Sequence, residues 1–367
     1  MTLLRRIGLS VVTAILVLLV DAAPASAHTV SGQGATNFKT TQPVVSPAVA
    51  GLRLRSIEAG SRLQLTWTGS EELIVQGYEN EPYLRLGPDG IFRNRRSPAT
   101  YLNTVRSGAV NQPPDVDATA PPDWVRIGSG HTIAWHDHRT HWMGGLLPVD
   151  VRSAPGSFHD VVDWKVGMTV GSQPVVATGS LDWVPSSSAL PWLALIVVLI
   201  GLGALAGVVR RWAGLLLVGI AVLVLADVLH ALGTGLDFAG TVGHRLLLVV
   251  SGSYYSIVAW ALGLVAIRLL AKRSVDGLFA AVFTALVIGL FGGLADVVSL
   301  SRSQVPNSFG AATARLLIAV SIGLGGGVII GSILAFRRNR PLLDPDLDEG
   351  DGDDPVVPPV GPAAADA

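Results

Sequence analysis

The chain has 367 residues, of which 50% are hydrophobic and 14% are charged, and its mean hydropathy is positive. This composition is too apolar for an ordinary soluble domain and is typical of a protein with several membrane spans. The formal net charge is −1 and no basic stripe is present, so nothing in the sequence indicates a nucleic-acid partner. The chain contains no cysteine, which excludes disulfides, zinc fingers, iron–sulfur clusters and thiol catalysis.

The N-terminus has the pattern of a secretory signal peptide. Arg5 and Arg6 form the positive region, residues 7–20 form the apolar core, and Ala-Ser-Ala at 25–27 is a small-residue cleavage site. We therefore predict a signal peptide at residues 1–27, with an uncleaved anchor as the alternative. Cleavage would leave His28 as the first residue, where its α-amine and imidazole could chelate one metal ion. The alternative interpretation of His28 is a flexible exported end.

Residues 28–188 are predicted to form one extracytoplasmic all-β domain. Short segments rich in β-branched and aromatic residues recur along this region, which is typical of a sandwich of the cupredoxin or immunoglobulin type, or of a barrel. A tight turn at 88–90 precedes Ile91 and Phe92, whereas residues 94–124 resemble a loop. The predicted strand segments are 62–67, 73–78, 83–86, 131–138, 163–170 and 174–184.

From residue 190 the chain becomes predominantly apolar. Five apolar runs each approach the ~20 residues that a bilayer requires. We therefore predict an all-α bundle of five transmembrane helices over residues 189–336, with the lipid bilayer as its partner. Residues 337–367, which are acidic beyond the basic cluster at 337–340, are predicted to form a disordered cytoplasmic tail. The five runs lie at 190–209, 213–233, 246–270, 277–300 and 311–336.

The basic residues of the apolar half predict its orientation. Arg210-Arg211, Lys272-Arg273 and the cluster at 337–340 all fall on one side of the five-span arrangement. Because cytoplasmic loops carry an excess of lysine and arginine, that side should face the cytoplasm. We therefore expect a multi-pass plasma-membrane protein with its N-terminal domain outside and its C-terminus in the cytoplasm.

Residues 131–143, His-Thr-Ile-Ala-Trp-His-Asp-His-Arg-Thr-His-Trp-Met, hold four of the eight histidines and one of the three methionines. Alternate side chains of a strand share one face, so His136 and His138 should point the same way. Imidazole is the commonest metal ligand among side chains, and thioether sulfur favours Cu(I). We expect His136 and His138 to be the central pair of a metal site, with copper preferred over zinc. The candidate further ligands are His131, His141, His28 and Met143.

Ionisable residues also lie within or beside the predicted spans, where they are costly and default to functional candidates. Asp227 and His230 are three residues apart in the second span and therefore share a helix face. Two interpretations are open, a transport or ligand site and a structural pair such as Asp296–Arg315 that joins helices. The remaining candidates are Asp296 in the fourth span and His244, Arg245 and Arg315 at the outer ends of the third and fifth spans.

Three segments resemble an uncharacterised actinobacterial family of exported membrane proteins, and the resemblance covers most of the chain without implying an activity. They are Gly77-Tyr-Glu-Asn-Glu-Pro-Tyr-Leu-Arg85, Ser97-Pro-Ala-Thr-Tyr-Leu-Asn103 and Trp135-His-Asp-His-Arg-Thr-His-Trp-Met143. More distantly, the layout is similar to copper-resistance proteins of the C/D fusion type, in which a small exported β domain precedes a membrane domain. Trp-His-x-His also resembles one copper motif of multicopper oxidases. Those enzymes use several such motifs and a cysteine, so this chain has neither a type 1 copper centre nor multicopper oxidation.

Two classes of function follow from these patterns. In the first, the exported domain binds copper and passes it to the membrane bundle or senses it. In the second, the protein has a structural or interaction role in the cell envelope without bound metal, and the histidines are packed or hydrogen-bonded residues of a strand. An enzyme is less well supported. The main enzyme hypothesis is an oxidative copper enzyme that uses His28 with another histidine. A serine hydrolase is poorly supported, because the chain has no Gly-x-Ser-x-Gly elbow.

Overall fold

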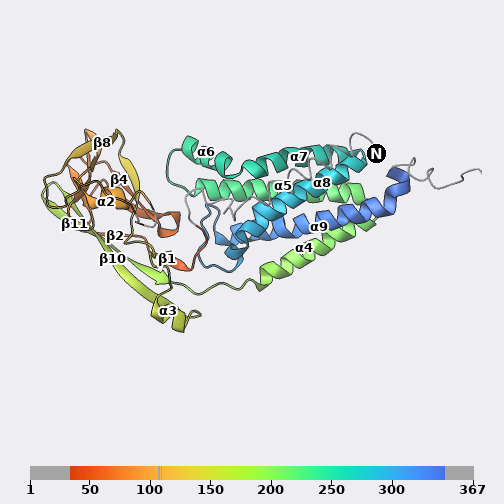
Figure 1. The fold of residues 1–367 in the computed structure, drawn as a ribbon, viewed down its shortest axis with the longest axis horizontal. Coiled ribbons are helices and arrows are strands. Elements are labelled where there is room, and N and C mark those ends of the chain that lie inside the picture. Colours follow the sequence, from red (N-terminus) through yellow and green to blue (C-terminus); the bar gives the residue numbers. More distant parts are fainter. Residues whose placement is uncertain (1–33, 106–107, 109, 344–367) are drawn as a thin grey trace, which may run out of the picture.

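The computed structural model describes residues 34–343 except 106, 107 and 109. Figure 1 shows a β-rich part at one end of an elongated bundle of helices. The predicted signal peptide at 1–27, His28, and residues 344–367 of the predicted tail lie outside the described residues.

Two antiparallel sheets make up the β-rich part. The larger sheet has the order β1-β11-β10-β5-β6-β7-β8, with β2 also paired to β11, and the smaller sheet has the order β3-β4-β9. The strands are β1 (Phe38–Thr40), β2 (Val44–Ser46), β3 (Leu52–Ile57), β4 (Arg62–Trp67), β5 (Leu73–Gln76), β6 (Pro82–Gly87), β7 (Gly90–Asn94), β8 (Trp124–Gly128), β9 (Thr132–His136), β10 (His159–Val170) and β11 (Gln173–Trp183). Three short helices, η1 (Glu58–Gly60), α2 (Pro98–Leu102) and α3 (Val149–Ser153), lie between strands.

Side chains from both sheets form one hydrophobic cluster. In β4 the buried residues alternate with more exposed ones, and Leu63, Leu65 and Trp67 point inward. In β10 of the other sheet, Val166 and Met168 alternate in the same way and belong to the same cluster. This period of two is the pattern that the sequence shows, because successive side chains of a strand point to opposite faces. The predicted predominance of β-strands in this region is confirmed, although three short helices interrupt it.

Five helices are long and apolar enough to cross a membrane, which confirms the predicted multi-pass class and a bilayer environment. The fourth span is one continuous helix with three kinds of helical geometry. An α-helical stretch is followed by a π-helical turn and then by a 3₁₀-helical stretch. The helices are α4 (Leu190–Val208), α5 (Trp212–Leu236), α7 (Tyr254–Ala271), the continuous α8 (Val275–Val287), η2 (Ile288–Gly293) and η3 (Leu294–Leu300), and α9 (Ala311–Leu343).

Two boundaries differ from the sequence prediction. The predicted third span at 246–270 is two helices, α6 (Val242–Gly252) and α7, which meet at a non-helical Ser253. Glycine and serine have lower helix propensity than the apolar residues around them, which accounts for the break. At the other boundary, α9 continues to Leu343, so residues 337–343 are helical although we placed them in a disordered tail. Arg338 donates a hydrogen bond to the carbonyl of Val208 at the end of α4, which ties this extension to the bundle.

Glycines let α4 and α9 approach each other closely. A Cβ placed on Gly203 would lie 2.5 Å from the carbonyl carbon of Gly327, and one on Gly207 would overlap the backbone of Gly331. Both helices carry glycines four residues apart at this contact, which is the small-xxx-small pattern of closely packed membrane helices. The two helices therefore pack backbone against backbone.

We predict that Gly207→Val destabilises the full-length protein by about 1–3 kcal/mol, because the new side chain must push α4 away from α9. The measurement is the unfolding of purified protein in detergent. Gly201→Val is the matched control on the same helix, since a Cβ on Gly201 would meet nothing within 4 Å. Equal losses of stability for the two variants would contradict the close contact.

Candidate functional site

The histidine-rich segment turns at Asp137, directly after β9 ends. The predicted strand at 131–138 therefore stops two residues early, and His136 and His138 do not share one strand face. Asp137 is fully buried and accepts a hydrogen bond from Trp135 Nε1 at 2.9 Å. Arg139 binds the same carboxylate with two nitrogens, Nε at 2.8 Å and Nη2 at 2.7 Å. The geometry is a buried bidentate ion pair, which is stronger than an ordinary hydrogen bond.

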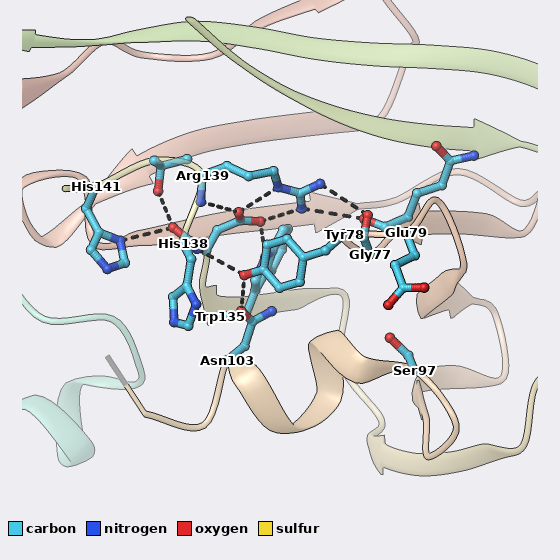
Figure 2. A network of polar contacts seen from close by, with 12 residues as sticks. Gly77, Tyr78, Glu79, Ser97, Asn103, Trp135, His138, Arg139 and His141 are labelled. Carbon is cyan, nitrogen blue, oxygen red and sulfur yellow. Dashed lines mark hydrogen bonds and ion pairs between the residues drawn. The ribbon is translucent and has the colours of Figure 1, made fainter. Parts of the chain in front are cut away.

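The three segments that carry the family resemblance meet around this ion pair (Figure 2). Tyr78 of the first segment donates its hydroxyl proton to Asn103 of the second and accepts the backbone N–H of His138 of the third at 3.0 Å. Arg139 also lies over the Tyr78 ring, 5.0 Å from its centroid. Residues about 60 positions apart in sequence are thereby joined in one network.

A second buried carboxylate organises the turn between β5 and β6. Glu81 is 3% exposed and accepts hydrogen bonds from the Ser97 hydroxyl at 2.5 Å and from the Glu79 N–H at 2.9 Å. Gly77 packs against this carboxylate, and a Cβ there would overlap it. Glu81 therefore ties the first segment to the second independently of Tyr78. We did not single out Glu81, Tyr78 or Asn103 from the sequence, although all three lie in the segments that suggested the resemblance.

The network keeps its groups in fixed ionisation states. Burial, and then the negative charge of Asp137, raise the pKa of Tyr78, so its hydroxyl remains protonated and able to donate to Asn103. Burial raises the pKa of Tyr83 to about 12. Burial alone would lower the pKa of Arg139, but its hydrogen bonds to Asp137 and the Asp137 charge raise it overall. The guanidinium therefore remains charged opposite the buried carboxylate.

Three of the four histidines of the segment each place one ring nitrogen against a backbone carbonyl. His136 Nδ1 lies 3.1 Å from Ser61 O, His138 Nε2 lies 3.1 Å from Val105 O, and His141 Nδ1 lies 3.0 Å from Asp137 O. Because a carbonyl only accepts, each of these nitrogens carries the proton, and a neutral ring then keeps the lone pair on its other nitrogen. Metal-binding histidines are commonly oriented in this way.

His138 lies beside His141 rather than following β9. Their ring centroids are 5.6 Å apart and the rings are perpendicular, as Figure 2 shows at the edge of the network. Met143 is near the same place, since a Cβ on Gly108 would lie 2.8 Å from His138 Cε1 and 3.5 Å from Met143 Cε. His131, in contrast, is exposed and precedes the opposite end of β9. Among the described residues, no group of three or more His, Cys, Asp or Glu side chains is arranged to hold a metal ion.

The polar residues of the membrane helices contact one another across helices. His230 Nε2 of α5 lies 3.0 Å from Asp296 Oδ2 of η3, and Trp260 Nε1 of α7 donates to Asp227 Oδ2 at 2.7 Å. The π-helical turn η2 packs beside them, and a Cβ on Gly292 would overlap the Asp227 carboxylate. Such turns occur frequently at functional sites.

Arg315 and His244 have surroundings separate from these pairs. Arg315 donates to the carbonyl oxygens of Ser299 at 3.2 Å and of Arg302, so it holds the end of η3 and the loop that follows. The predicted pair Asp296–Arg315 is therefore wrong, because Asp296 pairs with His230 instead. His244 is exposed in the first turn of α6.

No protein-family model matches the chain, and neither a curated protein nor a solved structure matches it. The resemblances to an actinobacterial family and to copper-resistance proteins therefore stay predictions.

We predict that Asp137→Asn costs about 3–5 kcal/mol of folding free energy, because it leaves the Arg139 guanidinium partly buried without its counter-charge. Chemical denaturation of the full-length protein, followed by tryptophan fluorescence, measures the loss. Glu72→Gln is the control, since the Glu72–Arg85 pair is exposed and its removal should cost below about 1 kcal/mol. A loss no larger than that of the control would show that the ion pair does not hold the network together.

Proposed function

We propose that the protein is a membrane-anchored extracytoplasmic copper-binding protein that passes copper to its membrane bundle or senses it. The ligands are His138, His141 and Met143. The single observation that carries this proposal is the placement of two perpendicular imidazole rings 5.6 Å apart, with Met143 and His138 bordering the same glycine.

The chemistry of this donor set favours Cu(I). A metal–imidazole bond is about 2 Å long, so one ion fits between rings at this separation. Zinc sites in proteins are almost always four-coordinate with nitrogen, sulfur or carboxylate ligands. No such group is present among the described residues, whereas Cu(I) accepts fewer ligands and binds thioether sulfur. Met143 is 40% exposed, which leaves the ligand set open to an arriving ion.

Within this proposal His136 is placed outside the ligand set. Its ring is directed to Ser61 beside β4, whereas the His138 ring is directed to Val105 in the loop after α2. This differs from the pair expected from strand alternation, His136 with His138. His131 contributes no ligand in this arrangement, and His28 lies outside the described residues.

The alternative is a structural or interaction protein of the envelope without bound metal. The observation that favours it is the use of Asp137, Arg139 and the backbone of His138 in internal contacts that join three segments. In that case the histidines serve only to hold loops through their carbonyl contacts. Copper binding distinguishes the two functions directly.

The orientation of the protein is part of the proposal. The three basic clusters all lie at the end of the bundle away from the β-rich part, after α4, after α7 and at the end of α9. By the positive-inside rule this end faces the cytoplasm of a plasma-membrane protein, and the β-rich part is exported. A cupredoxin- or immunoglobulin-like type for the β-rich part also stays a prediction.

We expect the full-length protein in detergent to bind Cu(I) in competition with a chromogenic chelator. The double variant His138→Ala/His141→Ala should bind at least about tenfold more weakly, since even orienting residues of metal sites change affinity by 10–100-fold. His131→Ala is the matched control and should bind like the parent. His136→Ala separates the two ligand sets, because it weakens binding only if His136 is a ligand. An unchanged affinity in the double variant would leave the structural role as the function.

Reporter fusions test the orientation. A periplasmic-type reporter joined after residue 187, 240 or 305 should be active, whereas one joined after 274 or 345 should be inactive, because those two positions adjoin the basic clusters. A cytoplasmic-type reporter should give the opposite pattern. An active periplasmic-type reporter after residue 345 would contradict the five-span orientation.

A further inference from the structure

A cavity of about 630 Å³ lies where the β-rich part meets the membrane bundle. One side of it comes from β1, β3 and η1, and the other from the end of α5, from α6 and from the loop before α9. Its volume is within the range of small-molecule sites, which is roughly 300–1,000 Å³. None of the metal-site residues lines it.

The two sides of the cavity are held in place by hydrogen bonds between the two parts of the chain. Thr36 and Gln304 exchange backbone hydrogen bonds of 3.0 and 2.8 Å, and Ser303 N–H donates to Asn37 Oδ1 at 2.9 Å. Ala239 N–H, just after α5, donates to Glu58 Oε1 at 3.1 Å. The cavity is therefore a built feature of the junction.

Two buried polar atoms in the cavity wall have no hydrogen-bond partner. Glu58 has a side chain that is only 2% exposed. Its Oε1 accepts from Ala239 N–H and forms an ion pair with Arg62 Nη1 at 3.5 Å, whereas its Oε2 has no hydrogen-bond partner. Arg245 of α6 has an unsatisfied buried Nε. An unpaired buried acceptor or donor costs about 1–3 kcal/mol, and more when the group is charged. These two atoms are themselves closed to solvent, so what Glu58 and Arg245 contribute to the cavity lining is one carboxylate charge and one guanidinium charge.

The other charged residues of the cavity wall are likewise both anionic and cationic. Asp237 adds a second carboxylate beside Glu58, and burial followed by the Glu58 charge raises the pKa of Asp237. Lys39 and Arg55 add two further cations from β1 and β3. A purely anionic ligand would face Glu58 and Asp237, and a purely cationic ligand would face the three basic residues.

We propose that this cavity binds a zwitterion that carries an ammonium group close to a phosphate or carboxylate. The ammonium pairs with the Glu58 carboxylate, and the anionic group accepts from the Arg245 guanidinium. The same chemistry occurs in a phosphatidylethanolamine headgroup and in a soluble zwitterion. A headgroup is within reach because the cavity lies at the end of α5, one of the five helices long enough to cross a membrane, and beside the short apolar helix α6.

The probe is O-phosphoethanolamine, titrated calorimetrically into the full-length protein in nanodiscs of phosphatidylglycerol, which supplies no ammonium group. We expect saturable binding, and binding at least about tenfold weaker in Glu58→Gln and in Arg245→Gln, since each change removes one charge-assisted hydrogen bond. Glycerol 3-phosphate, which lacks the ammonium, should also bind at least about tenfold more weakly. Glu72→Gln and Arg53→Gln are matched controls outside the cavity and should bind like the parent.

Native mass spectrometry of protein in mixed phosphatidylethanolamine and phosphatidylglycerol nanodiscs identifies the source. Retention of phosphatidylethanolamine that depends on Glu58 assigns the site to a lipid headgroup. Binding of the free probe without such retention assigns it to a soluble zwitterion. If Glu58→Gln fails to fold, Arg245→Gln carries the test. Absence of probe binding and of lipid retention in the parent, or binding that neither variant weakens, would overturn the proposal and leave water as the occupant.

Discussion

The buried Asp137–Arg139 ion pair is the interaction on which the arrangement of the β-rich part depends. A carboxylate removed from water must be compensated by charge and hydrogen bonds. Here the compensation comes from Arg139, from Trp135 and from the N–H of Arg139 itself. Because Arg139 also donates to the Gly77 carbonyl at 3.3 Å, the position of the β5–β6 turn depends on the same pair.

The position of the candidate copper ligands is a consequence of this ion pair. Once Asp137 turns into the interior, the chain leaves β9 and His138 moves beside His141. The Tyr78 hydroxyl then fixes the backbone of His138, and the Tyr78 ring stacks on the His138 ring with centroids 5.9 Å apart. The metal-site proposal and the structural role of the segment are therefore compatible, since the network that holds the fold also orients the two imidazoles.

In the membrane bundle, glycines and polar pairs have different roles. The glycines of α4 and α9 permit close backbone contact, which is a main source of association between helices in lipid. The polar pairs connect α5 to the fourth and third spans, through His230–Asp296 and Asp227–Trp260. Both pairs lie in the half of α5 that is nearer the β-rich part. The bundle thus places these polar residues toward the junction, where the cavity and the β-rich part are found.

The sequence by itself determined the class of protein, the two-part organisation and most of the elements. Enrichment in β-branched and aromatic residues located strands such as β4 and β11, and apolar length located five spans, because these signals depend only on neighbouring residues. It did not reveal β1, β2, β3 or β8, of which β1 and β2 are too short to show an alternating pattern. It also did not reveal the break at Ser253 within an apolar run.

The candidate site was located by sequence only as a segment. Its histidine-rich composition identified residues 131–143, but the pairing of His138 with His141 required the tertiary structure. Strand alternation predicts which side chains share a face only while the strand continues, and the burial of Asp137 ends it. The partners of that carboxylate, and the unpaired Glu58 and Arg245 atoms at the junction, come from distant parts of the chain. Long-range contacts of this kind follow from the packing of whole elements, which local sequence patterns do not specify.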